Sequence, residues 1–353
     1  MRRASALTAV VLWVLCDIAA AEASRAGAEG SAPRGGTTPN VAVLMGPADP
    51  RAQSGGRIAR VLAGGVLTAH VAADPDQQAG WWFVYGDDVL ACGAVRLDAT
   101  GHGRLSLAVP EVRARTVCRL LVRAHVGSDA LEVEVFPSSM LAPAAGRLAG
   151  LRLAVADPTG RVMAALEAEK VDFEPMETDI QKLIFDGDVA ILAGHQQAAA
   201  LAAACRGLEG RLTRGMTVVV LNPPSQWQAW GFRRTDFEEP LSGRAHLATG
   251  FQQILQPGDL GIGPWPCAIE TQAHLVPLVW VEHEDVQAGG RPSRKATVHV
   301  LAGARRVGKG RLIVAMLPQA DDPVGDPVGR AVLDELLLWT ARQYDTGKKE
   351  PDG

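Results

Sequence analysis

The stretch from Gly303 to Leu317, GARRVGKGRLIVAML, decides the fold expected for the C-terminal part of the chain. Gly303, Gly308 and Lys309 match a nucleotide-binding P-loop, and the stretch departs from that motif only at the residue after the lysine. A P-loop needs Ser or Thr after the lysine to bind Mg²⁺, and a following helix whose amide groups hold the phosphates. Here Gly310 takes the hydroxyl position, and RLIVAML is an apolar run typical of a buried strand. Together with KATVHVLAG upstream, the stretch predicts a β-hairpin with a glycine turn.

The chain begins with a segment typical of a secretory signal. Arg2 and Arg3 precede an apolar run, and small residues at Ala21–Ala23 form an A-x-A-like cleavage site. We expect residues 1–23 to be a signal peptide and the mature protein to be secreted or periplasmic. A lipid on Cys16 is disfavoured, because bulky residues precede that cysteine. No later apolar run is long enough to span a bilayer, so no membrane association is expected after cleavage.

Charge and cysteine content narrow the classes of partner and cofactor. The chain has 35 Lys and Arg against 39 Asp and Glu, and these are scattered without a basic patch, so nucleic acid is not an expected partner. CxxC pairs and clustered histidines are absent from the sequence, and no metal or other cofactor is expected. Four cysteines remain after signal removal. Cys92 and Cys118 could close a disulfide loop of about 25 residues, although free buried thiols fit the spacing equally well.

The pattern of apolar residues changes along the chain and predicts two domains. Residues 24–40 are rich in Gly, Ala, Ser and Pro, which is typical of a flexible linker. Residues 41–137 show short alternating strands with frequent turns, which favour an Ig-like antiparallel β-sandwich. Within it Trp81 and Trp82 are adjacent, so one should face the core and the other the surface, where an indole can stack on a sugar.

The second predicted domain follows a Pro/Ala/Gly-rich linker at residues 138–150. From 151 to 345, continuous apolar strands such as VAILAG alternate with helical segments, which predicts a parallel sheet covered on both faces. Residues 346–353, GKKEPDG with the preceding threonine, are expected to form a disordered tail.

Candidate ligand-binding residues follow from this predicted sheet, because ligands of such sheets lie beyond the carboxyl ends of the strands. The loop after TVVVLNPP also carries tryptophans, which we expect either to stack on a sugar or partner protein or to fill core beneath the loop. The candidate residues are Asp157, Thr159, Gly160, His195, Asn222, Trp227 and Trp230.

Four segments together resemble the C-terminal accessory region of bacterial beta-galactosidase and beta-mannosidase-like enzymes of glycoside hydrolase family 2. They are VPEVRARTVCRLLVRAHVGSDALEVEVFP, LRLAVADPTGRVMAALEA, DGDVAILAG and VGKGRLIVAMLPQADDPVGDPVGRAVLDELL. The resemblance covers roughly Val61 to Thr340, and EVEVFP and GKGRLIV are its most specific motifs. It implies an Ig-like sandwich followed by a flavodoxin-like domain related to class I glutamine amidotransferases. The catalytic barrel of that family has no counterpart in this length of chain.

The signal segment and the resemblance together imply an exported, non-catalytic binding or interaction module, with a carbohydrate or a partner glycosidase as its ligand. The alternative is a hydrolase or transferase with a site at the carboxyl ends of the strands, around Asp157, His195 and Asn222. The nucleophiles that this alternative needs are not evident in the sequence. Cys205 lies within a predicted helix, and Ser225 lacks the G-x-S-x-G elbow.

Overall fold

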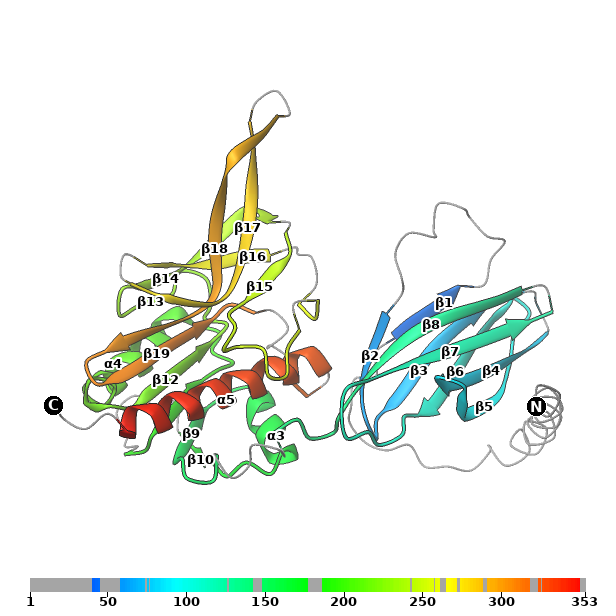
Figure 1. Ribbon diagram of the computed structural model, residues 1–353, viewed down its shortest axis with the longest axis horizontal. Helices are drawn as coiled ribbons and strands as arrows, with labels where there is room; N and C mark the ends of the chain where they lie inside the picture. Colours follow the sequence, from blue (N-terminus) through cyan, green and yellow to red (C-terminus); the bar gives the residue numbers. More distant parts are fainter. Residues whose placement is uncertain are drawn as a thin grey trace. The chain divides into compact units, whose positions relative to one another are not determined.

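The computed structural model describes residues 40–44, 58–73, 75, 77–125, 127–141, 148–176, 186–241, 243–256, 258–260, 265–271, 274–287, 291–317, 323–324 and 326–349. The chain folds into two compact units, Met1–Ser138 and Ser139–Gly353 (Figure 1). The predicted signal peptide lies outside the described residues, as does the predicted linker 24–40 apart from its last residue. Among the helices described, none is long and apolar enough to cross a bilayer.

The first unit consists of two sheets around one core. The smaller sheet has the order β1-β3-β6 and the larger one the order β2-β8-β7-β4-β5. The strands are β1 (Asn40–Leu44), β2 (Ile58–Leu62), β3 (Val66–Ala72), β4 (Gln78–Tyr85), β5 (Asp88–Arg96), β6 (His102–Ala108), β7 (Thr116–Ala124) and β8 (Gly127–Phe136). Two pairs, β1 with β3 and β2 with β8, are parallel, so the expectation of a purely antiparallel arrangement was wrong.

The two adjacent tryptophans of β4 face opposite sides of their sheet. Ala79 and Phe83 are fully buried, and Trp81, which has the same parity along the strand, packs against the core of the unit. Because side chains alternate along a strand, Trp82 lies on the outward face. The prediction that one of the pair faces the core is confirmed.

The two cysteines considered for a disulfide do not form one. Neither Cys92 nor Cys118 forms a disulfide. Cys92 lies on β5 and Cys118 on β7, and β4 runs between these two strands. Two strand spacings amount to about 9–10 Å, whereas the Cα atoms of a disulfide lie within about 7 Å. Of the two alternatives left open by the sequence, the Cys92–Cys118 disulfide is therefore excluded for a geometric reason.

The second unit is built on one mixed sheet of 11 strands. Five strands run parallel in the order β10-β9-β11-β12-β19, and the sheet then continues through antiparallel strands. The parallel strands are β9 (Leu153–Ala156), β10 (Glu174–Pro175), β11 (Val189–Leu192), β12 (Thr217–Leu221) and β19 (Gly310–Ala315). The others are β13 (Gln228–Ala229), β14 (Phe232–Leu241), β15 (Ala245–Leu247), β16 (Trp265–Thr271), β17 (Val276–Gln287) and β18 (Arg291–Val307). The helices are α3 (Arg161–Ala168), α4 (Ala198–Arg214) and α5 (Pro327–Lys349).

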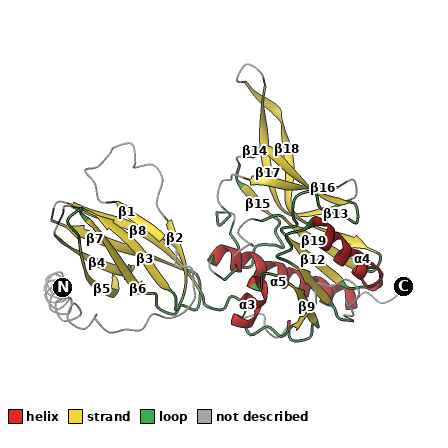
Figure 2. Cartoon of the chain, turned by 180° about the vertical axis from the view of Figure 1, so that it is seen from behind, coloured by secondary structure: helices red, strands yellow, loops and turns green. Residues whose placement is uncertain are grey.

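This sheet overturns the predicted fold class. The expected flavodoxin-like domain has a parallel sheet throughout, but six of the 11 strands, β13 to β18, extend the sheet as antiparallel pairs. In β14, FRRTDFEEPL, mostly partly exposed or exposed residues separate the two buried ends, whereas β9, β11 and β12 are buried throughout. Antiparallel pairing adds these strands, through the hairpins β13–β14 and β17–β18 and through pairs of non-consecutive strands such as β14 with β16. The chain as a whole is mostly β-structure, as Figure 2 shows.

The hairpin predicted for GARRVGKGRLIVAML is confirmed and joins the two halves of this sheet. Val307 pairs with Gly310 across the turn between β18 and β19, and Gly308 has a φ of 60°. The end of α4 presses against this turn, since a Cβ on Gly310 would lie 2.0 Å from the carbonyl oxygen of Leu212. Glycine is therefore required at Gly310 for close packing, and not for binding phosphate.

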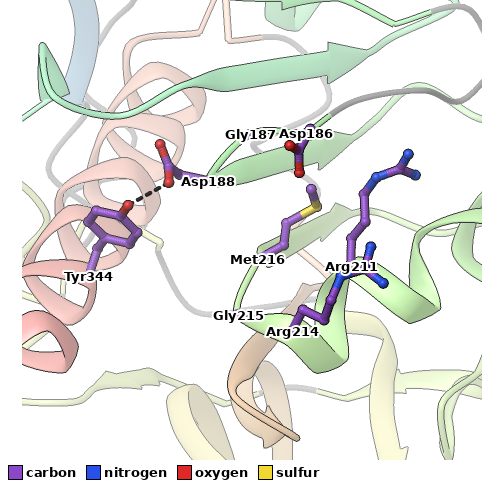
Figure 3. Close-up of a pocket in the computed structure, with 8 residues that line it drawn as sticks. All are labelled: Asp186, Gly187, Asp188, Arg211, Arg214, Gly215, Met216 and Tyr344. Atoms are coloured by element: carbon purple, nitrogen blue, oxygen red, sulfur yellow. Dashed lines mark hydrogen bonds between the residues drawn. The ribbon is translucent and has the colours of Figure 1, made fainter.

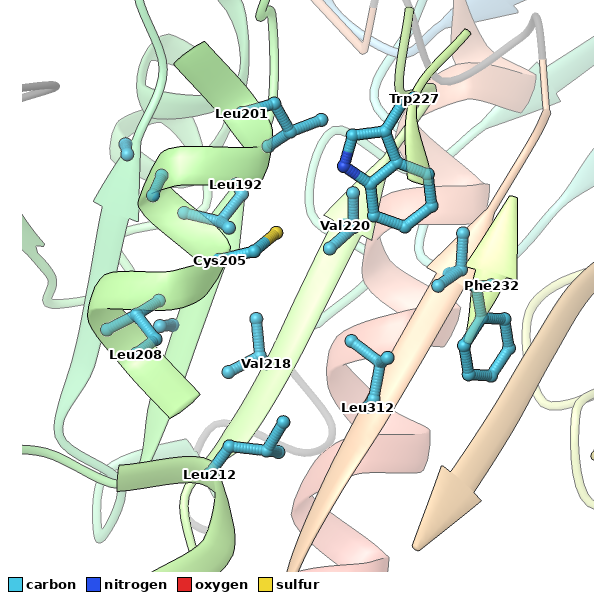
Figure 4. Packing of buried hydrophobic residues seen from close by; sticks show 14 of the residues in the cluster. Leu192, Leu201, Cys205, Leu208, Leu212, Val218, Val220, Trp227, Phe232 and Leu312 are labelled. Carbon is cyan, nitrogen blue, oxygen red and sulfur yellow. The ribbon is translucent and has the colours of Figure 1, made fainter. Parts of the chain in front are cut away.

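Helices cover both faces of the parallel strands. The apolar face of α4 packs on alternate residues of the strands, in a cluster that includes Leu208, Val218, Leu312 and Trp227 (Figure 4). Helices α3 and α5 lie on the opposite face, where Arg330 of α5 donates a hydrogen bond to the carbonyl oxygen of Ala165 in α3. Helix α5 continues to Lys349, which extends it into the segment expected to be a disordered tail.

Candidate functional site

The predicted residues after β9 form a helix cap. One oxygen of Asp157 accepts hydrogen bonds from the hydroxyl and amide groups of Thr159, at 2.6 and 3.1 Å, and the other accepts from the amides of Val162 and Met163 in the first turn of α3. Gly160, with a φ of 72°, precedes the helix. A carboxylate in this place satisfies amide groups that a helix leaves unpaired. Asp157, Thr159 and Gly160 are therefore positioned for a structural role.

His195 lies beside this cap at the end of β11, as the parallel order of β9 and β11 requires. Only 9% of its surface is exposed. Burial lowers the pKa of the imidazole, and the nearby Asp157 carboxylate opposes that effect. Among the described residues its Nε2 has no hydrogen-bond partner. The structure thus brings Asp157, Thr159 and His195 together as predicted, but Asp157 and His195 are buried, and only Thr159 is exposed.

Asn222 is also engaged with the backbone. Its side-chain amide donates to the carbonyl oxygen of Leu317 at 2.7 Å, and its main-chain amide donates to that of Ala315 at 2.7 Å. Its φ of 41° lies in the left-handed region, which asparagine tolerates better than most residues. Asn222 therefore ties the end of β12 to the end of β19.

Trp227 is a core residue. Its side chain is fully buried, and its indole nitrogen points toward the thiol of Cys205 on α4 (Figure 4). Burial raises the pKa of Cys205 to about 12, and the indole only partly opposes the shift. Since the thiolate is the reactive form of cysteine, Cys205 is inert at neutral pH. The structure assigns Trp227 to core packing, the second of the two roles expected for it.

A hollow of about 280 Å³ lies at the opposite, amino ends of β11 and β12 (Figure 3). One oxygen of Asp188 accepts from the Tyr344 hydroxyl of α5, and the other accepts from the amide of Arg152 at 2.8 Å. Asp188 therefore fastens α5 to the sheet. The other residues that line this hollow are Asp186, Gly187, Arg211, Arg214, Gly215 and Met216, none of which belongs to the predicted site.

A larger hollow of about 640 Å³ lies at the antiparallel end of the sheet and includes Trp230. We call this hollow the Trp230 groove. Its volume falls within the range of about 300–1,000 Å³ that is usual for small-molecule sites. The indole of Trp230 is partly buried against the core and partly exposed in the groove. The groove is lined by Gln228, Ala229, Trp230, Gly231, Phe232, Arg233, Glu270 and Thr271.

The backbone at Trp230 is strained. Ala229 pairs with Phe232, so Trp230 and Gly231 form a two-residue turn, and their φ values are 52° and 79°. A turn with two positive φ values is of type I′, which favours Asn-Gly, and a bulky residue in its first position is an outlier. Arg305 of β18 holds the turn by donating a hydrogen bond to the carbonyl oxygen of Trp230 at 3.0 Å. Such strain costs on the order of 1–3 kcal/mol and is concentrated at functional sites.

The polar wall of the groove is an ordered group of side chains. Arg233 of β14 pairs with Glu270 of β16 at 2.6 Å, and Thr235 donates to the same carboxylate oxygen at 2.8 Å. The hydrogen bond from Thr235 and that from Arg233 lower the pKa of Glu270, which is therefore anionic at neutral pH. All these bonds reach Oε2, which leaves Oε1 as an acceptor for a ligand hydroxyl group.

Sequence reasoning found Trp230 but missed its neighbours in the groove. Gln228 and Arg233 come from the two strands of one hairpin, and Glu270 pairs with Arg233 across β14 and β16. A signal was present, because the strand FRRTDFEEP contains five charged residues and only two phenylalanines. Sequence alone does not give the pairing of β14 with β16, and that pairing creates the site.

Comparison with known proteins gives no family assignment. No family model matches the chain, and no curated protein matches it. A chain of the ZIG-8–RIG-5 IG1–IG1 heterodimer is 16% identical over 24% of this chain and 83% of its own length, with a TM-score of 0.18. An exo-beta-1,4-mannosidase from an Opitutaceae bacterium, strain TAV5, is 11% identical over 55% of this chain and 35% of its own, with a TM-score of 0.31. A laccase from Pediococcus acidilactici is 9% identical over 72% and 42%, with a TM-score of 0.18. Similarity this low carries no functional argument.

Proposed function

We propose that the chain is an exported, non-catalytic binding module and that the Trp230 groove binds a carbohydrate. The observation that carries the proposal is the strained Trp230, whose partly exposed indole lines a hollow of about 640 Å³. An indole face accepts the C–H face of a sugar ring, and carboxylate, guanidinium, hydroxyl and amide groups hydrogen-bond to sugar hydroxyls. Glu270, Arg233, Thr271 and Gln228 supply these groups around Trp230.

The groove supports binding better than hydrolysis. Glycoside hydrolysis requires two carboxyl groups facing each other across the substrate, one of them protonated. Glu270 is the single acidic residue among the described residues that line the groove, and its pKa is lowered by Thr235 and Arg233. A ligand can be held at this site, but a general acid for its cleavage is not supplied there.

Replacement of Trp230 by asparagine is the sharpest test. Asparagine removes the ring but suits the first position of a type I′ turn. We expect Trp230→Asn to fold with an unfolding midpoint at or above that of the wild type, and to bind glycan at least tenfold more weakly. A glycan array with the mature protein identifies the ligand, and calorimetry then compares the variants.

Val276→Asn is the matched control for this experiment. Val276 is an exposed apolar residue of the same unit, with 60% of its surface accessible, and it does not line the groove. Its replacement is expected to leave binding unchanged. Unaltered glycan affinity in Trp230→Asn, or no glycan bound by the wild-type protein, would contradict the proposal.

A further inference from the structure

The outward face of β4 in the first unit carries a second partly exposed indole. Trp82 projects from this face, and its ring lies over Gly80, two residues earlier on the strand. A Cβ atom on Gly80 would lie 2.9 Å from Cη2 of Trp82, which is closer than a real Cβ atom approaches its neighbours. Glycine at this position therefore lets the ring extend along the strand. Alternate residues of a strand share a face, so the indole covers the sheet instead of standing apart from it.

The neighbours of Trp82 across the sheet form an apolar row. Cys92 of β5 and Leu121 of β7 lie directly opposite Trp82 on its two sides. Leu121 is 36% exposed, and Trp82 and Cys92 are partly exposed. An exposed contiguous apolar surface of this kind marks an interaction site.

Arginines surround this row. Arg123 of β7 lies opposite Gly80 in the strand register, and Arg96 of β5 lies opposite Gln78. Since Gln78 and Gly80 share the face of Trp82, both arginines lie on the outward face beside the indole. Arg119 lies on the other side, opposite Val84. All three arginines are exposed, and among the described residues none of them makes an ion pair. The acidic residues of this face lie on the next strand, β8, where Glu132 is the register partner of Arg119 across the two strands.

The other acidic residue that β8 places on this face, Glu134, is already neutralised. Glu134 is paired with Arg60 at 2.9 Å and with Arg115 at 2.8 Å. Burial raises the pKa of Glu134, but hydrogen bonds from Arg115 and Arg60 outweigh that effect and lower it. The strip formed by β5, β4 and β7 thus presents an indole, apolar neighbours and net positive charge.

We propose that this strip is a second binding surface and that its ligand is an acidic carbohydrate, one whose sugar rings bear carboxylate or sulfate groups. The ring face of the sugar stacks on Trp82, as at the Trp230 groove. Its anionic group pairs with Arg96 or Arg123, because a guanidinium binds such groups through two parallel hydrogen bonds. This surface differs from the Trp230 groove, where Arg233 and Glu270 neutralise each other.

The experiment uses three soluble polymers and the mature protein. They are polygalacturonate as the carboxylated probe, dextran sulfate as the sulfated probe and dextran as the neutral one. We expect one or both acidic polymers to bind and dextran not to bind at this surface. Raising the ionic strength from about 50 mM to about 500 mM should weaken binding, because exposed charges are screened. Binding of polygalacturonate alone indicates a carboxylated ligand, and binding of dextran sulfate alone indicates a sulfated one.

Three variants locate the surface. Trp82→Ala and the double variant Arg96→Gln with Arg123→Gln are each expected to weaken acidic-polymer binding at least tenfold. Arg104→Gln is the control, because Arg104 is an exposed arginine on β6 in the other sheet, and polymer binding by this variant should not change. The unfolding midpoint of each variant is measured alongside, and the arginine replacements test the surface even if Trp82→Ala destabilises the unit.

Acidic-polymer binding by the Trp230→Asn variant distinguishes this second surface from the Trp230 groove. A Trp230→Asn protein should still bind the acidic polymer, whatever becomes of glycan binding in the groove. The proposal is overturned if neither acidic polymer binds, if dextran binds the Trp230→Asn protein as well as the acidic polymers do, or if the arginine double variant binds as tightly as the wild type.

Discussion

Replacing Trp227 with alanine is expected to lower the free energy of unfolding by about 3–5 kcal/mol, the usual cost of truncating a large buried aromatic residue. The Trp227 side chain is fully buried and packs in the cluster that joins α4 to the sheet, near Leu201, Val220 and Cys205 (Figure 4). Truncation removes apolar contacts and leaves a cavity that the surrounding strands cannot close. Urea unfolding followed by far-UV circular dichroism measures the effect.

The Trp230→Asn variant is the matched control for this measurement. Both tryptophans lie in the same segment, but Trp227 is buried in the core, whereas Trp230 is partly exposed in the groove. We expect Trp227→Ala to change stability and Trp230→Asn to change binding. If Trp227→Ala unfolds at the wild-type urea concentration and has lost glycan binding, its assignment to the core is wrong.

These two tryptophans show how far the sequence specifies the site. The sequence identified a tryptophan-bearing loop at the end of the apolar run TVVVLNPP, and a strand that short is recognisable from its composition alone. It left open which indole fills the core, because that depends on where the loop turns. The turn lies at Trp230 and Gly231, and the favoured sequence for such a turn, Asn-Gly, is absent there.

The predicted fold class failed for a related reason. The strands β9, β11 and β12, the helices α3 and α4 and the hairpin at Gly308 are all evident as local patterns. Beyond β12, the sheet grows by pairing segments such as β14 with β16 and β15 with β17. Strand pairing depends on side chains far apart in the sequence, and a local period does not encode it. The antiparallel extension, which contains the Trp230 groove, is therefore the part that the sequence did not predict.

The buried charged residues of α5 were also not predicted from the sequence. Arg330, Asp334 and Glu335 lie on this helix and are almost completely buried, as is Glu169 at the end of α3. Glu169 accepts hydrogen bonds from the Ser139 hydroxyl and the Met140 amide, and Arg330 lies 3.7 Å from it. Burial, followed by the neighbouring charge of Glu169, raises the pKa of Asp334 well above its usual range, although Arg330 opposes the shift.

Asp334→Asn is therefore expected to stabilise the protein at neutral and alkaline pH, by about 2 kcal/mol, because the folded wild-type chain holds a proton on Asp334 at a pH where the unfolded chain releases it. The unfolded chain releases the Asp334 proton near pH 4, whereas the folded chain retains it to a higher pH. Wild-type stability consequently falls as pH rises from about 4 through the raised pKa, and the variant does not share this loss. The stability difference should shrink toward zero at about pH 4 and grow with pH in urea titrations.

Glu335→Gln provides the contrast to Asp334→Asn. The Glu335 carboxylate accepts hydrogen bonds from the amides of Ile254 and Leu255 and lies 3.5 Å from Arg342, so its charge is used in the folded state. We expect its neutralisation to destabilise the protein, because removing one partner leaves the others without a matching acceptor. A loss of stability in Asp334→Asn at pH 8, equal to that in Glu335→Gln, would show that Asp334 is charged and paired in the native state. A gain that widens with pH locates the retained proton at Asp334.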